Sequence, residues 1–127
     1  MKRMLLLASI LLLLGACNTR PIYNAENVTV VTGSGSVPSQ EDARRVIVKA
    51  ATSKGWAVKD IDSTHLQVSH TARGHTAQAV VEYSTNSFSI TYHDSIRMKY
   101  KGTTIHRKYN GWIRNLEERI QQYFAEI

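Results

Sequence analysis

Residues 65–83 read His-Leu-Gln-Val-Ser-His-Thr-Ala-Arg-Gly-His-Thr-Ala-Gln-Ala-Val-Val-Glu-Tyr. On both sides of the Ala-Arg-Gly turn, apolar and polar side chains alternate, as they do in strands that bury one face. The same alternation recurs at 88–92, and an apolar segment at 56–61 precedes an Asp-Ser-Thr turn. The pattern predicts an antiparallel meander of four strands, apolar on one face and polar on the other. A short fifth strand is expected at 97–100.

Two amphipathic helices are expected to flank this meander. Ser39 and Asp42 stand three residues apart and form a capping box, and a Gly-Trp pair at 55–56 supplies a stop signal. Apolar residues recur at helical spacing between these signals, so a helix is predicted over 39–54. A longer apolar stripe runs to the C-terminus, and we expect its helix to start near Thr104, capped by Thr103 or Thr104.

Each helix has one apolar face, and so does the sheet. Burying these faces together gives a two-layer α+β domain over residues 38–127. The predicted order is α-β-β-β-β-α, with an N-terminal and a C-terminal helix packed on one face of a four- to five-stranded antiparallel meander. Because Cys17 is the only cysteine, no internal disulfide is available, and the fold depends on its apolar core.

Residues 1–17 have the pattern of an export signal. Lys2 and Arg3 precede a leucine-rich run that ends in Leu-Gly-Ala-Cys at 14–17. An apolar run of about a dozen residues is shorter than the roughly 20 that span a bilayer as a helix. The ending resembles the lipobox of bacterial lipoproteins, which implies a signal peptide over 1–16 and lipidation of Cys17. The alternative is an ordinary secretory signal with an incidental cysteine.

The lipoprotein resemblance also implies a location. In Gram-negative lipoproteins an Asp after the lipidated cysteine commonly retains the protein in the inner membrane, and Asn18 stands at this position. We therefore expect anchoring in the outer membrane, facing the periplasm, through acyl chains such as palmitate on Cys17. Residues 17–37 end in a Gly/Ser-rich segment and are expected to form a flexible tether. Within them, Val-Thr-Val-Val at 28–31 has the character of an edge strand.

Removal of the signal lowers the formal net charge from +6 to +4, because Lys2 and Arg3 leave with it. The most polarised stretch is 97–108, which contains only basic charges: Arg97, Lys99, Lys101, Arg107 and Lys108. In a strand, the first three would project to one face. The stretch predicts either a solvated sheet edge or contact with an anionic surface, such as lipid headgroups or cell-wall polymer. Nucleic acid is not expected as a partner of an exported chain.

Residues with catalytic or metal-binding chemistry are sparse. His65, His70 and His75 recur at intervals of five without an HxH or HExxH pattern, so surface histidines are favoured over metal ligands. Asp60 and Asp62 stand beside a turn, where Asp is common. No GxSxG or SxxK motif frames a serine. We therefore expect no catalytic residue, no metal and no cofactor, and a hydrolase is the least favoured hypothesis.

Aromatic side chains are candidates for binding a small ligand or an envelope polymer: Tyr92, Tyr100, Tyr109 and Trp112. This hypothesis requires that they line a concave pocket. His106 and Asn110 are also candidate ligand contacts, because they lie one helical turn apart beside the apolar stripe. Their alternative role is hydrogen bonding to the end of the sheet.

The run Ile-His-Arg-Lys-Tyr-Asn-Gly-Trp-Ile-Arg-Asn-Leu at 105–116 resembles a motif of small, uncharacterised proteobacterial lipoproteins. In that family a Gly-Trp pair follows the first helix and a Tyr-rich hairpin follows it, as at 55–56 and 88–92 here. Gly111 departs from the motif, because a longer side chain is expected there. The resemblance implies an envelope lipoprotein and brings no activity with it.

These features together predict a lipid-anchored periplasmic protein that is not an enzyme. A protein-interaction or envelope-assembly module is the favoured function. The alternative is a binder of a small ligand or an anionic envelope polymer. The expected partners are the membrane, through the N-terminal lipid, and another envelope protein or polymer.

Overall fold

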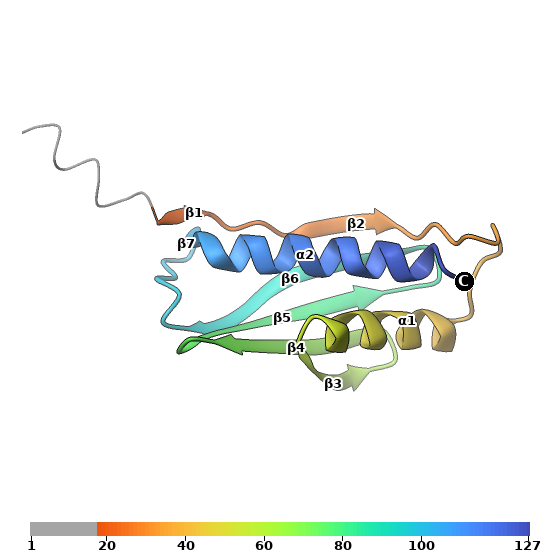
Figure 1. The fold of residues 1–127 in the computed structure, drawn as a ribbon, viewed down its shortest axis with the longest axis horizontal. Helices are drawn as coiled ribbons and strands as arrows, with labels where there is room; N and C mark the ends of the chain where they lie inside the picture. Colours follow the sequence, from red (N-terminus) through yellow and green to blue (C-terminus); the bar gives the residue numbers. More distant parts are fainter. Residues whose placement is uncertain (1–17) are drawn as a thin grey trace, which may run out of the picture.

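Five antiparallel strands form the main sheet in the computed structural model, which describes residues 18–127 (Figure 1). In spatial order they are β2 (Ala25–Thr29), β6 (Ser87–Ile96), β5 (His75–Tyr83), β4 (His65–Ala72) and β3 (Ala57–Asp62). The strands from β3 to β6 pair with their neighbours in sequence, which confirms the predicted meander. A second sheet pairs β1 (Thr19–Pro21) with β7 (Thr104–His106). The predicted signal peptide and Cys17 lie outside the described residues.

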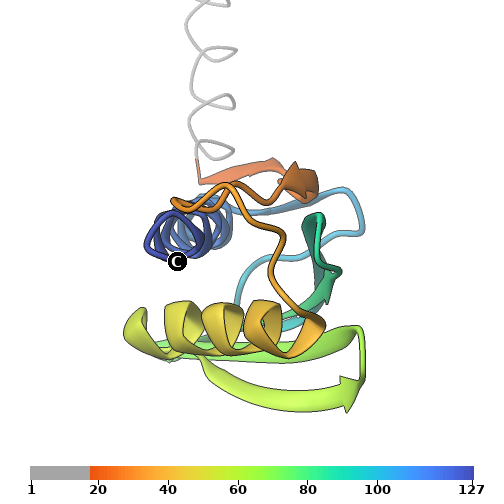
Figure 2. The same cartoon turned by 90° about the vertical axis from the view of Figure 1, so that its right-hand side faces the viewer.

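The two helices are α1 (Gln40–Ser53) and α2 (Arg107–Phe124). Both lie on the same face of the curved sheet (Figure 2). Half of the predicted capping box of α1 is confirmed, because the Ser39 hydroxyl accepts the Asp42 N–H at 3.0 Å, whereas the Asp42 carboxylate pairs with Arg45 at 3.2 Å. The helix stops at Gly55, whose φ of 84° is the left-handed conformation that glycine adopts without strain. Trp56 then turns back and donates its N–H to the Ala51 carbonyl at 3.0 Å.

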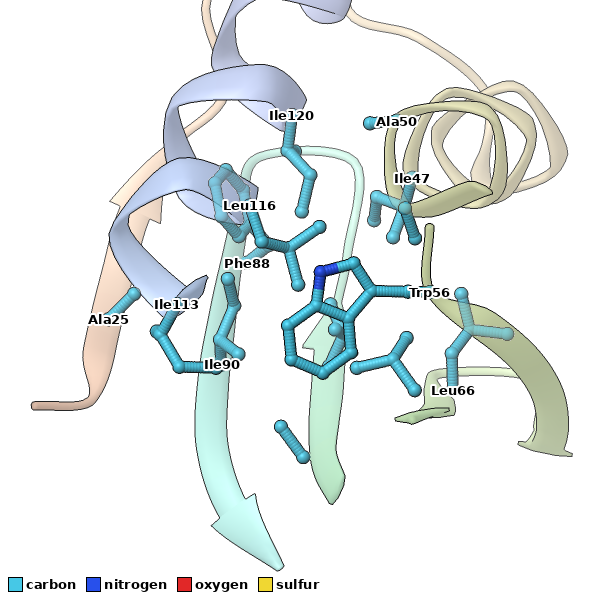
Figure 3. Packing of buried hydrophobic residues seen from close by; sticks show 14 of the residues in the cluster. Ala25, Ile47, Ala50, Trp56, Leu66, Phe88, Ile90, Ile113, Leu116 and Ile120 are labelled. Carbon is cyan, nitrogen blue, oxygen red and sulfur yellow. The ribbon is translucent and has the colours of Figure 1, made fainter. Parts of the chain in front are cut away.

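One apolar core fills the space between the helices and the sheet. The strands contribute side chains from a single face, as in the cross-strand pairs that Val81 makes with Leu66 and Ile90. The Trp56 ring, 4% exposed, lies between the two helices and closes the core from the start of β3 (Figure 3). Each fully buried Val, Leu or Ile side chain of this core stabilises the fold by about 1.5–3 kcal/mol relative to an exposed one.

The predicted order α-β-β-β-β-α is wrong, because β1 and β2 precede α1. The helix expected at 39–54 is therefore present, but it is not the N-terminal element. Its predecessor β2 pairs with β6, with Val28 opposite Phe88, and the Val30 N–H donates to the Asn86 carbonyl at 2.8 Å. The β-branched character of 28–31 indicated an edge strand, and the structure places that strand slightly earlier.

The segment expected as a flexible tether, 17–37, is built into the fold from residue 18 to residue 30. Asn110 holds it from α2: its side-chain carbonyl accepts the Tyr23 N–H at 3.0 Å, and its side-chain amide donates to the Pro21 carbonyl at 2.9 Å. The Asn18 carbonyl accepts the Arg107 N–H at 2.8 Å. Residues 18–30 are therefore part of the folded domain.

Residues 97–100 do not form the predicted fifth strand. Arg97 and Lys99 have φ values of 59° and 53°, in the left-handed region that no strand uses. Met98 between them is 1% exposed, and its carbonyl accepts the His106 N–H at 2.7 Å. The segment is therefore a loop fixed by one buried side chain.

The start of α2 near Thr104 is also wrong. Residues 104–106 pair with β1, and the helix begins at Arg107. His106 caps it, since its Nδ1 accepts the Lys108 N–H at 3.1 Å. Gly111 lies inside α2 with open space where a side chain would be, so no backbone of the described chain approaches it closely. Between Asn18 and Ile127, neither helix has both the length and the apolar character to cross a membrane.

Candidate functional site

Basic residues gather at the end of the domain where the described chain begins. There β1, the loop between β6 and β7, and the start of α2 lie together (Figure 1). We call this region the basic end and define it by six cations: Arg73, Arg97, Lys99, Lys101, Arg107 and Lys108. All six residues are exposed. Five of them are the cations predicted at 97–108, and the structure brings them to one end without a strand.

Arg73 joins this group from a distant part of the sequence. It lies in the β4–β5 turn, with a φ of 52°. The register of β5 and β6 brings that turn to the end of β6, because Thr76 stands opposite Ile96. A side chain at Gly74 would meet a guanidinium nitrogen of Arg97 at 3.5 Å. Only the strand register joins Arg73 to the other five, so sequence reasoning missed it.

The cations of the basic end have no counter-ion within the described chain. No Asp or Glu between residues 18 and 127 lies within ion-pairing distance of any of the six. Arg44, by contrast, pairs with Asp60 at 2.7 Å. His106, half-buried among the cations, has a pKa lowered first by burial and then by the charges of His75, Lys108, Lys99 and Arg107. The local potential is therefore positive.

The start of α2 adds to this potential. Helix N-termini carry a partial positive charge, so acidic residues stabilise the first turn and basic ones destabilise it, each by about 0.3–1 kcal/mol. The first turn of α2 holds Arg107 and Lys108 and no acidic residue, whereas α1 begins with Glu41 and Asp42. Like charge is thus concentrated at the basic end at a cost in helix stability.

Three of the four aromatic candidates, Tyr92, Tyr100 and Tyr109, pack against one another. Tyr92 stacks on Tyr100 at 4.3 Å between ring centroids and meets the edge of Tyr109 at 5.5 Å. Tyr109 is fully buried, and burial raises the pKa of its hydroxyl, which has no hydrogen-bond partner in the described chain. His106 and Asn110 make their hydrogen bonds within the protein, to Lys108 and to the segment before β2.

Trp112 lies apart from this aromatic group and contacts His70. The His70 ring lies between Trp56 and Trp112, with centroid distances of 5.3 and 4.7 Å. Its Nδ1 hydrogen-bonds to the Gly55 carbonyl at 3.1 Å. His70 therefore connects the segment after α1, at Gly55 and Trp56, to Trp112 on α2.

His75 lies at the basic end, where its Nδ1 hydrogen-bonds to the Arg97 carbonyl at 2.7 Å. Asp60, Asp62 and His65 lie at the opposite end, where each carboxylate has a partner. The Arg44 guanidinium forms two hydrogen bonds to Asp60, at 2.9 and 2.7 Å, and lowers the pKa of that carboxyl. Asp62 accepts the Thr64 N–H and bonds His65 at 2.8 Å; these contacts lower the pKa of Asp62, and the Asp62 contact raises the pKa of His65. In the described chain, no group of three or more His, Cys, Asp or Glu is arranged to hold a metal ion.

The outer face of the sheet is polar and is not covered by either helix (Figure 2). Across β4, β5 and β6, this face carries mainly hydroxyl and amide side chains around Val80, with Ser69 opposite Gln78 and Thr71 opposite Thr76. The two threonine hydroxyls hydrogen-bond at 2.9 Å. Such a face offers hydrogen-bond donors and acceptors to a partner.

A hollow of about 330 Å³ lies beside α1 and is lined by Asp42, Arg45, Val46, Lys49 and Ile127. A smaller hollow of about 150 Å³ shares Val46, Lys49 and Ile127 with it. The sequence placed Ile127 in the apolar stripe of the last helix, but the side chain is 43% exposed, beyond the end of α2. This hollow was not predicted.

No family model, curated protein or solved structure matches the chain. The function is therefore inferred from the residues and geometry described above.

Proposed function

We propose that the protein is a lipoprotein of the bacterial envelope that is anchored through Cys17, faces the periplasm from the outer membrane, and binds another envelope protein. The uncovered polar face of β4, β5 and β6 is the observation that favours protein binding. The role is assembly or interaction, without turnover of a substrate.

The N-terminal sequence supports the anchor. Two cations, a leucine-rich run and Leu-Gly-Ala-Cys at 14–17 occur in the order of a lipoprotein signal. A single acyl chain binds membranes reversibly, whereas more than one chain makes the attachment durable. Incorporation of labelled palmitate into the wild-type protein, with none in Cys17→Ser, is the expected result. Equal labelling of both proteins would contradict the proposal.

The geometry of the sheet favours its face over its edges as the binding surface. A bulge or a charged side chain in an edge strand hinders its pairing with a partner's strand. The edge strand β3 has a register shift between Asp60 and Asp62, and β2 at the other edge has one between Ala25 and Val28. Lys59 adds a charge to the β3 edge. Both edges are thus protected, and the outer face remains available.

Photo-cross-linking in intact cells tests this surface. A photoreactive amino acid replaces Gln78 on the outer face or, as the control, exposed Gln121 on α2. We expect one dominant cross-linked protein from position 78, none from position 121, and loss of the product in Cys17→Ser. The same product from both positions would contradict the role of the face, and no product from either would contradict the protein-binding proposal.

A further inference from the structure

We propose that the basic end of the domain rests on the anionic lipid headgroups of the membrane that holds the anchor. The sheet then stands with its opposite end, which carries Asp60 and Asp62, away from that membrane. The orientation rests on the proposed lipidation of Cys17, whereas affinity for anionic lipid is a property of the folded domain alone.

The basic end includes Asn18, the residue that follows the proposed attachment point in the sequence. One peptide bond separates Cys17 from Asn18, and the Asn18 carbonyl is hydrogen-bonded to the N–H of Arg107 at 2.8 Å. Pairing of Thr19 with His106 continues this contact. Because 18–30 is built into the fold, the domain has no tether that would lift it from the bilayer. Acyl chains on Cys17 therefore bring Arg107 and Lys108 close to the headgroups, where screening over about 8 Å leaves the attraction effective.

The charges of the basic end are available for a lipid surface. The segments that meet there, 18–22, 72–75 and 94–108, contain one carboxylate, Asp94. The six cations have no ion pair with any carboxylate of the described chain. Arg107 and Lys108 also stand at the positive end of α2, where basic residues lower helix stability. An anionic surface would relieve this repulsion.

Two large apolar side chains favour a membrane over a soluble anionic polymer. Ile96 is 59% exposed and Tyr100 is 45% exposed, and both alternate with the cations of the β6–β7 loop. Tyrosine is enriched at the membrane–water interface, where its ring enters the headgroup region while its hydroxyl stays hydrated. Basic residues interspersed with exposed apolar ones are the composition of a surface that binds lipid by charge and shallow insertion.

Vesicle binding of the unlipidated mature chain, residues 17–127 with Cys17→Ser, tests the inference. This chain contains the whole core described above, and circular dichroism verifies its folding. The vesicles contain phosphatidylglycerol and phosphatidylethanolamine or, for comparison, phosphatidylcholine alone. The test variant is Lys99→Glu with Lys101→Glu; the matched control is Lys54→Glu with Lys59→Glu, two exposed lysines away from the basic end.

We expect the parent chain and the control variant to bind the anionic vesicles and not to bind vesicles of phosphatidylcholine alone. Binding to the anionic vesicles should weaken as the salt concentration increases. Each cation near an anionic membrane contributes about fivefold to partitioning, so the test variant should bind at least about 25-fold more weakly. Should that variant fold poorly, Arg107→Gln with Lys108→Gln provides the same comparison without charge reversal. It should lose a similar factor.

Equal binding by the test variant and the control, or no binding of the parent chain to anionic vesicles, would overturn the inference. Binding to soluble polyphosphate without binding to vesicles would also overturn it, and would assign the basic end to an envelope polymer. These outcomes are independent of the palmitate experiment. A chain that binds vesicles but carries no palmitate refutes the anchor alone, and a lipidated chain without vesicle binding refutes only the docking of its basic end.

Discussion

The two ends of the sheet carry charge in different ways. At the end that holds the β3–β4 turn, the carboxylates have partners: Arg44 lies 2.7 Å from Asp60, and His65 lies 2.8 Å from Asp62. At the basic end, six exposed cations have no such partner in the described chain. Charge at the first end is satisfied within the fold. The cations of the basic end remain available to bind an anionic partner outside the protein.

The helices repeat this contrast. α1 begins with the Ser39 cap followed by Glu41 and Asp42, the arrangement that stabilises an N-terminus. α2 begins with a histidine cap followed by Arg107 and Lys108. A sequence selected only for stability would begin both helices with acidic residues.

The largest effect is expected where the basic end is joined to the core. Asn110→Ala removes the hydrogen bonds to the end of β1 and to the segment after it, and leaves the Pro21 carbonyl and the Tyr23 N–H without this partner. We expect a loss of about 3 kcal/mol in the free energy of unfolding, measured in urea. Asn115→Ala, at an exposed position of the same helix, should change it by less than about 0.5 kcal/mol. Similar small effects for both variants would contradict the role of Asn110.

The cap of α1 should have a smaller effect, at the opposite end. Ser39→Ala removes the acceptor of the Asp42 N–H and should lower the free energy of unfolding by about 1 kcal/mol. Restoration by Ser39→Asp, which keeps a capping oxygen, is the control. A variant as stable as the wild type would show that the cap contributes nothing.

Exchanging the charges of the two helix starts tests the contrast itself. Lys108→Glu should stabilise the protein by about 0.5 kcal/mol while weakening binding to anionic vesicles. Glu41→Lys, at the start of α1, should destabilise by a similar amount and leave vesicle binding unchanged or stronger. Thermal melting and vesicle sedimentation on the same samples measure both quantities. If Lys108→Glu destabilises the protein, the basic residues of α2 are structural.

The two ends should also respond to pH with opposite sign. The contact with Asp62 raises the pKa of His65, so its stabilising contribution is present below about pH 6.5 and is lost as pH rises through the raised value. Burial and neighbouring cations lower the pKa of His106, so its contribution is present above about pH 6.5 and is lost as pH falls. NMR titration should find His65 above and His106 below the ordinary histidine value. The reverse order would contradict the geometry at both ends.

Periodic sequence patterns predicted the meander, α1 and the apolar face of α2, because each of these elements spans enough residues for a period to appear. The three-residue strands β1 and β7 have no such period, and their pairing across the chain depends on contacts such as the one between Asn110 and Pro21. The alternating cations at 97–101 have the sequence pattern of a strand. The segment is a loop because Met98 is buried and its two neighbours have left-handed φ values.

The candidate surface was predictable in part for similar reasons. Five of its cations are close in sequence, so their count revealed them. Arg73 and the proximity of Asn18 to Arg107 depend on strand register and on a single backbone hydrogen bond. Neither leaves a signal in local composition.

The orientation of the lipidated protein on a bilayer tests the central claim most directly. Cys17 is the only cysteine, and the proposed lipid would occupy its thiol, so a fluorophore on Thr103→Cys or on Ser63→Cys labels one end at a time. The strands that join the ends span about 30 Å, beyond the reach of a quencher on lipid headgroups. We predict strong quenching at position 103 and little at position 63 in phosphatidylglycerol-containing vesicles. Equal quenching at both positions, or stronger quenching at 63, would contradict the account.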